Sequence, residues 1–117
     1  MALAVTRLER TTGWDSAWQA ADGYEFVVLE IALENLGLDD APVNLLSFQL
    51  IDSRGLHYFV AAAAPAPELE SGYVLRGLTA RGNIAFEVPL GASGLILVYQ
   101  PSALPGGAAP VILPLGP

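Results

Sequence analysis

The chain has no cysteine, no lysine and only one histidine, His57. It therefore cannot provide a catalytic thiolate, a Schiff-base amine, a thiolate zinc site or a pair of histidine ligands within one subunit. Without cysteine, no disulfide framework can be read, and the redox compartment stays open. These absences remove most catalytic chemistry, so we expect a protein that is not an enzyme and that carries no cofactor.

Basic charge and long apolar runs are also scarce. Five arginines stand against twelve aspartate and glutamate residues, which gives a net charge of -7. The chain thus lacks a basic surface that could neutralise nucleic-acid phosphates or anionic lipid headgroups. No stretch reaches the ~20 apolar residues of a membrane span, and the apolar run in residues 1–10 is too short for the core of a signal peptide. We expect no nucleic-acid partner and no membrane insertion by this segment, and any leader or lipid anchor of an exported protein would lie upstream of it.

What the chain does have is apolar content. Hydrophobic residues make up 53% of the sequence and charged residues only 15%, which is the opposite of a disordered segment. A length of 117 residues suits one domain, since single domains cluster around ~100–150 residues. We therefore expect one folded domain that spans residues 1–117.

Alternating hydrophobic residues predict β-strands along most of the chain. In the clearest pattern, at residues 23–35, one side of a period-two ribbon carries Val27, Leu29, Ile31 and Leu33. The other side carries Val28, Glu30, Ala32 and Glu34, which predicts a half-buried strand. Further strands are expected at residues 2–11, 43–51, 56–61, 71–78, 83–88, 95–100 and 111–113. Seven to eight short strands with regular turn signals predict an all-β, two-sheet sandwich.

Turn residues separate these strands. Asp52 and Gly55 fit the two ends of a hairpin turn, because glycine tolerates the positive φ that such a turn needs. Residues 80–82 are expected to form another turn. The prolines that flank residues 111–113 would confine that last strand to the edge of its sheet.

The inner face of the strand at 43–51 is predicted from the same alternation. Leu46, Phe48 and Leu50 fall on one side of this strand, and Ser47 and Gln49 fall on the other. We therefore expect all three apolar side chains to enter the core.

Three blocks of sequence share a pattern with a known family. Residues 23–35 read G-x-x-F-x-x-L-x-I-x-x-x-N, residues 48–58 read F-x-L-x-D-x-x-G-x-x-Y, and residues 82–89 read G-x-x-x-F-x-V-P. Together with residues 97–99 they resemble a bacterial secreted and lipoprotein domain of unknown function. That family is itself similar to the mycobacterial immunoprotective extracellular antigen.

This resemblance implies an immunoglobulin-like antiparallel sandwich that lies outside the cytoplasm, behind a signal peptide or a lipobox. None of the matched positions is catalytic in the family, so no functional residue carries over. The family commonly has a Pro-Gly turn shortly before the third block, whereas this chain has Thr-Ala-Arg-Gly at residues 79–82.

Two tryptophans form the best candidate binding site. Trp14 and Trp18 flank Asp15 in the longest stretch between the first two expected strands. An exposed tryptophan pair can stack on sugar rings or anchor a partner protein. The competing interpretation, which we favour, is that both indoles close the open end of the sandwich, because large aromatic residues are mostly buried.

A cluster of oxygen-bearing side chains suggests a calcium site. Glu34, Asn35, Asp39 and Asp40 surround one turn, and Asp15 or Asp22 could join them from a neighbouring loop. Calcium takes six to eight oxygen ligands from a defined loop, and a spaced pattern such as D-x-D-x-D-G is absent here. A plain acidic turn is therefore the favoured interpretation.

His57 lies near Ser47, Asp52 and Ser53 in the sequence, which are the residue types of a catalytic triad. The chain has no G-x-S-x-G nucleophile elbow, so we expect a surface imidazole instead.

These observations favour an extracytoplasmic, non-enzymatic binding or structural module that contacts another protein. One alternative is a protease inhibitor that presents residues 12–22, 61–72 or 89–94. Another alternative is a calcium-binding or carbohydrate-binding accessory domain. Because lysine is a usual guard against edge pairing and is absent here, we also expect a homodimer through a sheet face or edge.

Overall fold

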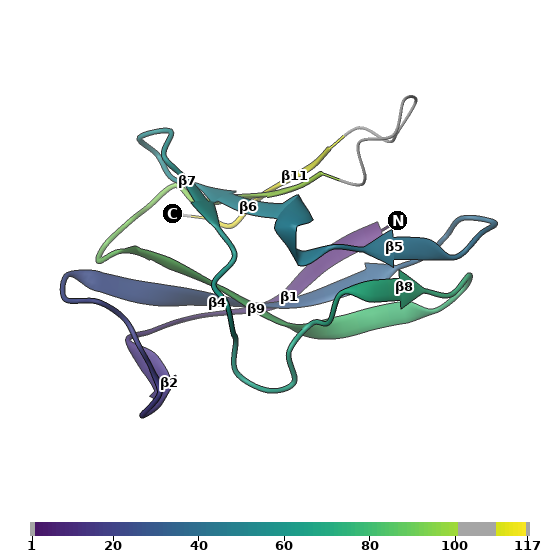
Figure 1. The fold of residues 1–117 in the computed structure, drawn as a ribbon. Helices are drawn as coiled ribbons and strands as arrows, with labels where there is room; N and C mark the ends of the chain where they lie inside the picture. The colour runs from purple at the N-terminus through teal and green to yellow at the C-terminus, as the bar shows by residue number, and fades with distance from the viewer. Residues whose placement is uncertain (1, 101–109, 117) are drawn as a thin grey trace.

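The computed structural model describes residues 2–100 and 110–116. Within these residues, seven strands form two antiparallel sheets that pack face to face (Figure 1). The first sheet, in the order β1-β4-β9, contains β1 (Ala2–Thr11), β4 (Tyr24–Glu34) and β9 (Thr79–Pro89). The second, in the order β11-β10-β6-β7, contains β11 (Val111–Pro114), β10 (Ile96–Tyr99), β6 (Phe48–Ile51) and β7 (His57–Phe59). The predicted all-β sandwich is confirmed, and β11 is an edge strand as expected.

Shorter elements complete the described part of the chain. One ribbon pairs β2 (Gly13–Asp15) with β3 (Trp18–Gln19), and another pairs β5 (Ala41–Val43) with β8 (Gly72–Val74). A single 3-10 turn, η1 (Leu45–Ser47), lies between β5 and β6. None of these described elements is a helix long and apolar enough to cross a membrane.

The main core lies between the two sheets. The first sheet contributes Val27, Leu29, Ile31 and Leu33 from β4 and Ile84, Phe86 and Val88 from β9. The second sheet contributes Phe48 and Leu50 from β6 and Leu97 and Tyr99 from β10. The rings of Phe48 and Tyr99 stack with their centroids 4.7 Å apart. Alternate residues of β4, β9, β6 and β10 therefore enter this core, as the alternation predicts.

The opposite face of β4 is also covered, which the sequence did not indicate. Phe26, Val28, Ala64 and Ala85 form a second buried cluster outside the first sheet. Residues 61–69 cross this face and bond to β9: the N–H of Ala61 donates to the Ala85 carbonyl at 2.7 Å. The prediction of a half-buried β4 was therefore wrong over this stretch, because a distant loop supplies the second cover.

The strand expected at 43–51 is interrupted by η1. Asn44 caps this turn, since its Oδ1 accepts the N–H of Leu46 at 2.9 Å. Leu46 is 69% exposed, whereas Phe48 and Leu50 are fully buried. Placing Leu46 in the core was wrong, because a 3-10 turn does not follow the two-residue alternation of a strand.

The turn expected at 80–82 is instead part of β9. The pairing of β9 with β4 begins at Thr79, opposite Glu34, and continues without interruption. The reversal comes earlier, where Gly77 has a φ of 81° and the N–H of Leu78 donates to the Leu75 carbonyl at 3.0 Å. The prediction was wrong because Gly82 does not form a turn. It lies where the backbone of β9 closely approaches the backbone of Glu68 and Leu69.

Candidate functional site

The hairpin of β2 and β3 is shaped by Asp15. Its Oδ1 accepts the N–H of Ala17 at 2.8 Å and the N–H of Trp18 at 3.1 Å. This is an Asx turn, in which the carboxylate satisfies main-chain donors that the tight reversal leaves free. Asp15 therefore positions Trp18. Both N–H donors lie within three residues of Asp15 in the chain.

The two tryptophans form an aromatic stack on the outer side of the first sheet. The rings of Trp14 and Trp18 are nearly parallel, 14° apart in plane, with centroids 6.0 Å apart. Trp14 also packs on Phe26 of β4, with ring centroids 4.8 Å apart. Trp14 thus belongs to the second cluster, whereas Trp18 remains at the surface with 36% of its area exposed.

Trp18 lines a groove of about 610 Å³ between the hairpin and β7. The lining residues are Ala17, Trp18, Gln19, Phe26, His57, Tyr58, Phe59, Ala61, Ala62 and Glu87. Phe59 is 63% exposed, so the groove carries accessible aromatic surface from two elements far apart in the sequence. The Oε2 of Glu87 accepts the N–H of Ala21 at 3.0 Å and ties the segment that follows the hairpin to β9.

Sequence reasoning found Trp18 but missed Phe59 and the alanines beside it. No local signal marks Phe59 as a site residue, because strands are generally rich in aromatic residues. Its meaning comes from the pairing of β7 at the end of the second sheet, next to the hairpin.

The residues of the calcium hypothesis form a hydrogen-bonded turn. The Nδ2 of buried Asn35 donates to the carbonyls of Asp39 at 2.8 Å and Val74 at 2.9 Å. Its Oδ1 accepts the N–H of Gly37 at 2.9 Å. Within residues 2–100 and 110–116, no group of three His, Cys, Asp or Glu side chains is placed to hold a metal ion.

Asp40 and Glu34, the other acidic residues of the calcium hypothesis, take no part in the hydrogen bonds of the Asn35 amide. Asp40 Oδ1 accepts the N–H of Arg76 at 3.1 Å. Glu34 is exposed at the end of β4.

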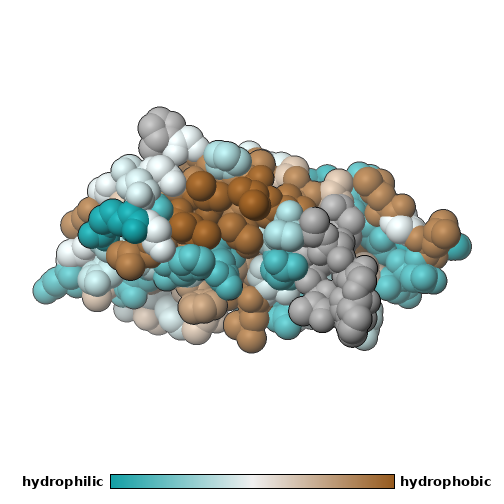
Figure 2. Space-filling model, turned by 90° about the horizontal axis from the view of Figure 1, so that it is seen from above, coloured by the Kyte–Doolittle hydropathy of each residue, from teal (hydrophilic) through white to brown (hydrophobic). Residues whose placement is uncertain are grey.

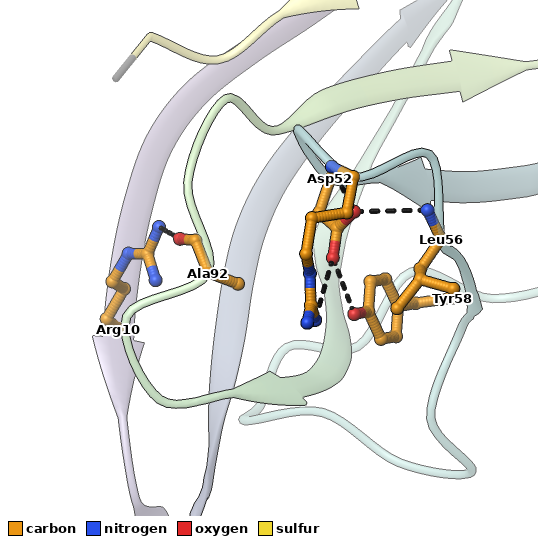
Figure 3. A network of polar contacts seen from close by, with 6 residues as sticks. Arg10, Asp52, Leu56, Tyr58 and Ala92 are labelled. Atoms are coloured by element: carbon orange, nitrogen blue, oxygen red, sulfur yellow. Dashed lines mark hydrogen bonds and ion pairs between the residues drawn. The ribbon is translucent and has the colours of Figure 1, made fainter.

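Asp52 forms a buried polar network at the turn between β6 and β7 (Figure 3). Its Oδ1 accepts the N–H groups of Arg54 at 2.8 Å and Leu56 at 3.0 Å, and its Oδ2 accepts the Tyr58 hydroxyl at 2.8 Å. Gly55 has a φ of 81°, which confirms the predicted hairpin turn.

His57 and Asp52, two of the residue types of a catalytic triad, are hydrogen-bonded to other side chains. The Nδ1 of His57 lies 3.0 Å from Gln49 Oε1, and Asp52 bonds to Tyr58.

The network changes the acidity of Asp52. Burial alone would raise the pKa of its carboxyl, but the hydrogen bonds from Tyr58, Leu56 and Arg54 and the charge of Arg54 outweigh this, so the pKa lies below the ordinary value of 3.8. Burial is the main cause that raises the pKa of Tyr58 above 10.0, and the hydrogen bond to Asp52 raises it further. The ionised carboxylate is therefore part of the folded turn.

We expect Asp52 to make stability depend on pH in the acid range. The pKa of Asp52 is lower in the folded protein than in the unfolded chain. The Asp52 carboxylate therefore stabilises the fold fully above the unfolded pKa, and this stabilisation is lost as pH falls below about 4 through the folded pKa. In Asp52→Asn, the melting temperature should be lower near pH 6 and should fall less on acidification. Thermal melts of both proteins between pH 6 and pH 2 test this, with Glu9→Gln as an exposed control. Parallel curves for the wild type and Asp52→Asn would contradict the assignment.

The loop at 89–94 is held against the first sheet. The Nη2 of Arg10 donates to the Ala92 carbonyl at 2.6 Å (Figure 3), and Arg10 also pairs with Glu25 at 3.1 Å. The N–H of Gly91 donates to Glu25 Oε2 at 3.2 Å. This loop is thus tied to β1 and β4 by side chains on both strands.

Comparison with known families gives one match. The family described as "Domain of unknown function (DUF4352)" matches residues 1–109. No curated protein matches the sequence.

Several solved structures share the fold. The ycdA protein of Bacillus subtilis, named as a candidate lipoprotein, aligns with a TM-score of 0.78 at 18% identity over 97% of this chain. The chain spans only 35% of the length of ycdA. The yjhA protein of Bacillus subtilis aligns with a TM-score of 0.67 at 21% identity, covering 85% of this chain and 73% of its own.

A third solved structure is the secreted protein MPT63 of Mycobacterium tuberculosis. It aligns with a TM-score of 0.60 at 17% identity, covering 86% of this chain and 75% of its own. At these identities the likeness is one of fold, and it agrees with the immunoglobulin-like sandwich and with the resemblance to secreted and lipoprotein domains.

Proposed function

We propose that this chain, which belongs to the DUF4352 family of domains of unknown function, is an extracytoplasmic, non-catalytic module that binds a protein partner. The observation that carries the proposal is the groove in which Trp18 of the hairpin and Phe59 of β7 both present exposed aromatic surface. Structural neighbours named as a candidate lipoprotein and a secreted protein support the compartment.

The aromatic stack suits Trp18 to anchoring a partner. Trp14 packs against Trp18 on one side and against Phe26 on the other. A ring held in this way loses little conformational freedom on binding, and buried aromatic anchors supply much of the free energy of protein association.

The groove is suited to an extended segment of the partner. It is bordered by β7, the last strand of its sheet, and its lining combines aromatic and alanine side chains with polar groups from Gln19, His57 and Glu87. An extended peptide beside such a strand can add main-chain hydrogen bonds while one apolar side chain enters the groove. We therefore propose a peptide-like segment with an aromatic or aliphatic residue as the ligand.

A displayed library of nine-residue peptides provides the test. Selected peptides should shift the amide NMR signals of residues that line the groove. Trp18→Ala and Phe59→Ala should each weaken binding of a selected peptide by tenfold or more.

Tyr73→Ala is the matched control, because Tyr73 of β8 is an exposed aromatic residue outside the groove lining. Its affinity should equal that of the wild type. If Tyr73→Ala weakens binding as much as Trp18→Ala, or if cell-wall oligosaccharides shift the groove signals and no peptide does, the protein-binding proposal is wrong.

A further inference from the structure

The outer face of the second sheet is almost entirely apolar. In the pairing register, one row across the four strands contains Pro114, Ile96, Ile51 and His57. The next row contains Ile112, Val98, Gln49 and Phe59. The burial alternation along β10 and β6 turns these positions away from the core. Figure 2 looks down on this side of the sandwich and shows hydrophobic side chains gathered at its centre.

The two strongly polar side chains of this face lie within hydrogen-bond distance of each other. His57 Nδ1 and Gln49 Oε1 lie 3.0 Å apart, on neighbouring strands. Neither row contains Asp, Glu or Arg. A surface with paired polar groups and no charge can be covered by another apolar surface at little desolvation cost.

The sheet edges formed by β1, β11 and β9, in contrast, are protected against pairing. A bulge between Val5 and Arg7 interrupts β1, and the exposed ion pair of Arg7 and Glu9 lies beside it. Pro114 lies in β11, and residues 61–69 cover part of β9. Bulges, charges, prolines and covering loops are devices that prevent edge-to-edge association.

We propose that the outer face of the β11-β10-β6-β7 sheet binds the same face of a second copy of the chain. The molecule carries a net charge of -7, so two copies repel each other least when their uncharged faces meet. Two copies of the same face can also pack about a two-fold axis, the commonest arrangement of homodimers. The face shares His57 and Phe59 with the lining of the groove, but its other six residues lie outside that lining, so the two proposals can be tested separately.

The size of the face sets the expected affinity. Eight residues on four strands ~4.8 Å apart cover roughly 250 Å². A standard stable interface buries about 800 Å² on each partner. The dimer should therefore be weak and populated only at high protein concentration.

Sedimentation velocity over a concentration series tests the inference. The weight-average mass of the wild type should rise above the monomer mass of 12.3 kDa at the highest concentrations. Ile112→Glu, at a position already 61% exposed, should raise the dissociation constant at least tenfold while the melting temperature changes little. Val98→Glu, at a half-buried position of the neighbouring strand, should also raise the dissociation constant at least tenfold.

Leu38→Glu is the matched control, since Leu38 is 83% exposed in the turn after β4 and gains the same charge. It should associate like the wild type. A wild type that stays at the monomer mass up to about 1 mM, or a Leu38→Glu variant that loses association as Ile112→Glu does, would overturn the proposal. Because neither Val98 nor Ile112 lines the groove, failure here leaves the peptide-binding result unaffected.

Discussion

Replacing Gly82 with alanine should lower the free energy of unfolding by about 3 kcal/mol, because the new methyl group would overlap main-chain atoms. A Cβ at this position would lie 2.5 Å from the Cα of Leu69 and 2.7 Å from the carbonyl carbon of Glu68. Neither atom can move aside by a side-chain rotation. The loop or β9 must therefore shift as a whole.

The segment that would be displaced is bonded to β9 on both sides of the contact. The N–H of Asn83 donates to the Pro67 carbonyl at 2.8 Å, and the N–H of Leu69 donates to the Asn83 carbonyl at 3.0 Å. Leu69 is also buried in the main core. Moving the loop away from β9 therefore weakens its hydrogen bonds and its packing together.

Urea unfolding of Gly82→Ala measures the effect. Arg81→Ala is the control, because Arg81 is an exposed neighbour on the same strand and its loss should cost no more than ~0.5 kcal/mol. Equal midpoints for Gly82→Ala and the wild type would show that the close approach of the two backbones is not required.

Replacing Asn35 with alanine should cost about 2–3 kcal/mol of stability. Asn35 is only 2% exposed, and its amide bonds to three main-chain groups in the turn after β4 and in β8. Alanine leaves these groups without their partner, and a buried unsatisfied donor or acceptor loses its full solvation.

Denaturant midpoints of Asn35→Ala and Asn44→Ala provide the comparison. Asn44 is exposed and makes one side-chain capping bond to η1, so its replacement should cost about 1 kcal/mol or less. Similar losses for the two variants would contradict the structural role of Asn35. A calcium-dependent rise in melting temperature in the wild type that is absent in Asn35→Ala would instead support the metal hypothesis.

The sequence by itself was sufficient wherever structure depends on neighbours along the chain. The alternation from Val27 to Leu33 identified one wall of the main core, because strand side chains point to opposite faces at every step. Asp52 and Gly55 identified a hairpin, because their side-chain and backbone preferences operate within the turn itself. The prolines that flank residues 111–113 identified the edge strand, observed as β11, for the same local reason.

Only the tertiary structure decided what depends on segments that are far apart in the chain. Gly82 has the appearance of a turn residue in the sequence, but it is part of a strand because a loop 13 residues earlier packs against it. The groove requires the β2-β3 hairpin, which lies between β1 and β4 in the chain, to sit beside Phe59 of the second sheet. The apolar outer face requires β11 to lie beside β10 and β10 beside β6. Composition and periodicity determined that this chain forms a sandwich, whereas strand pairing decided which of its surfaces can bind, because contacts between distant segments leave no periodic trace in the sequence.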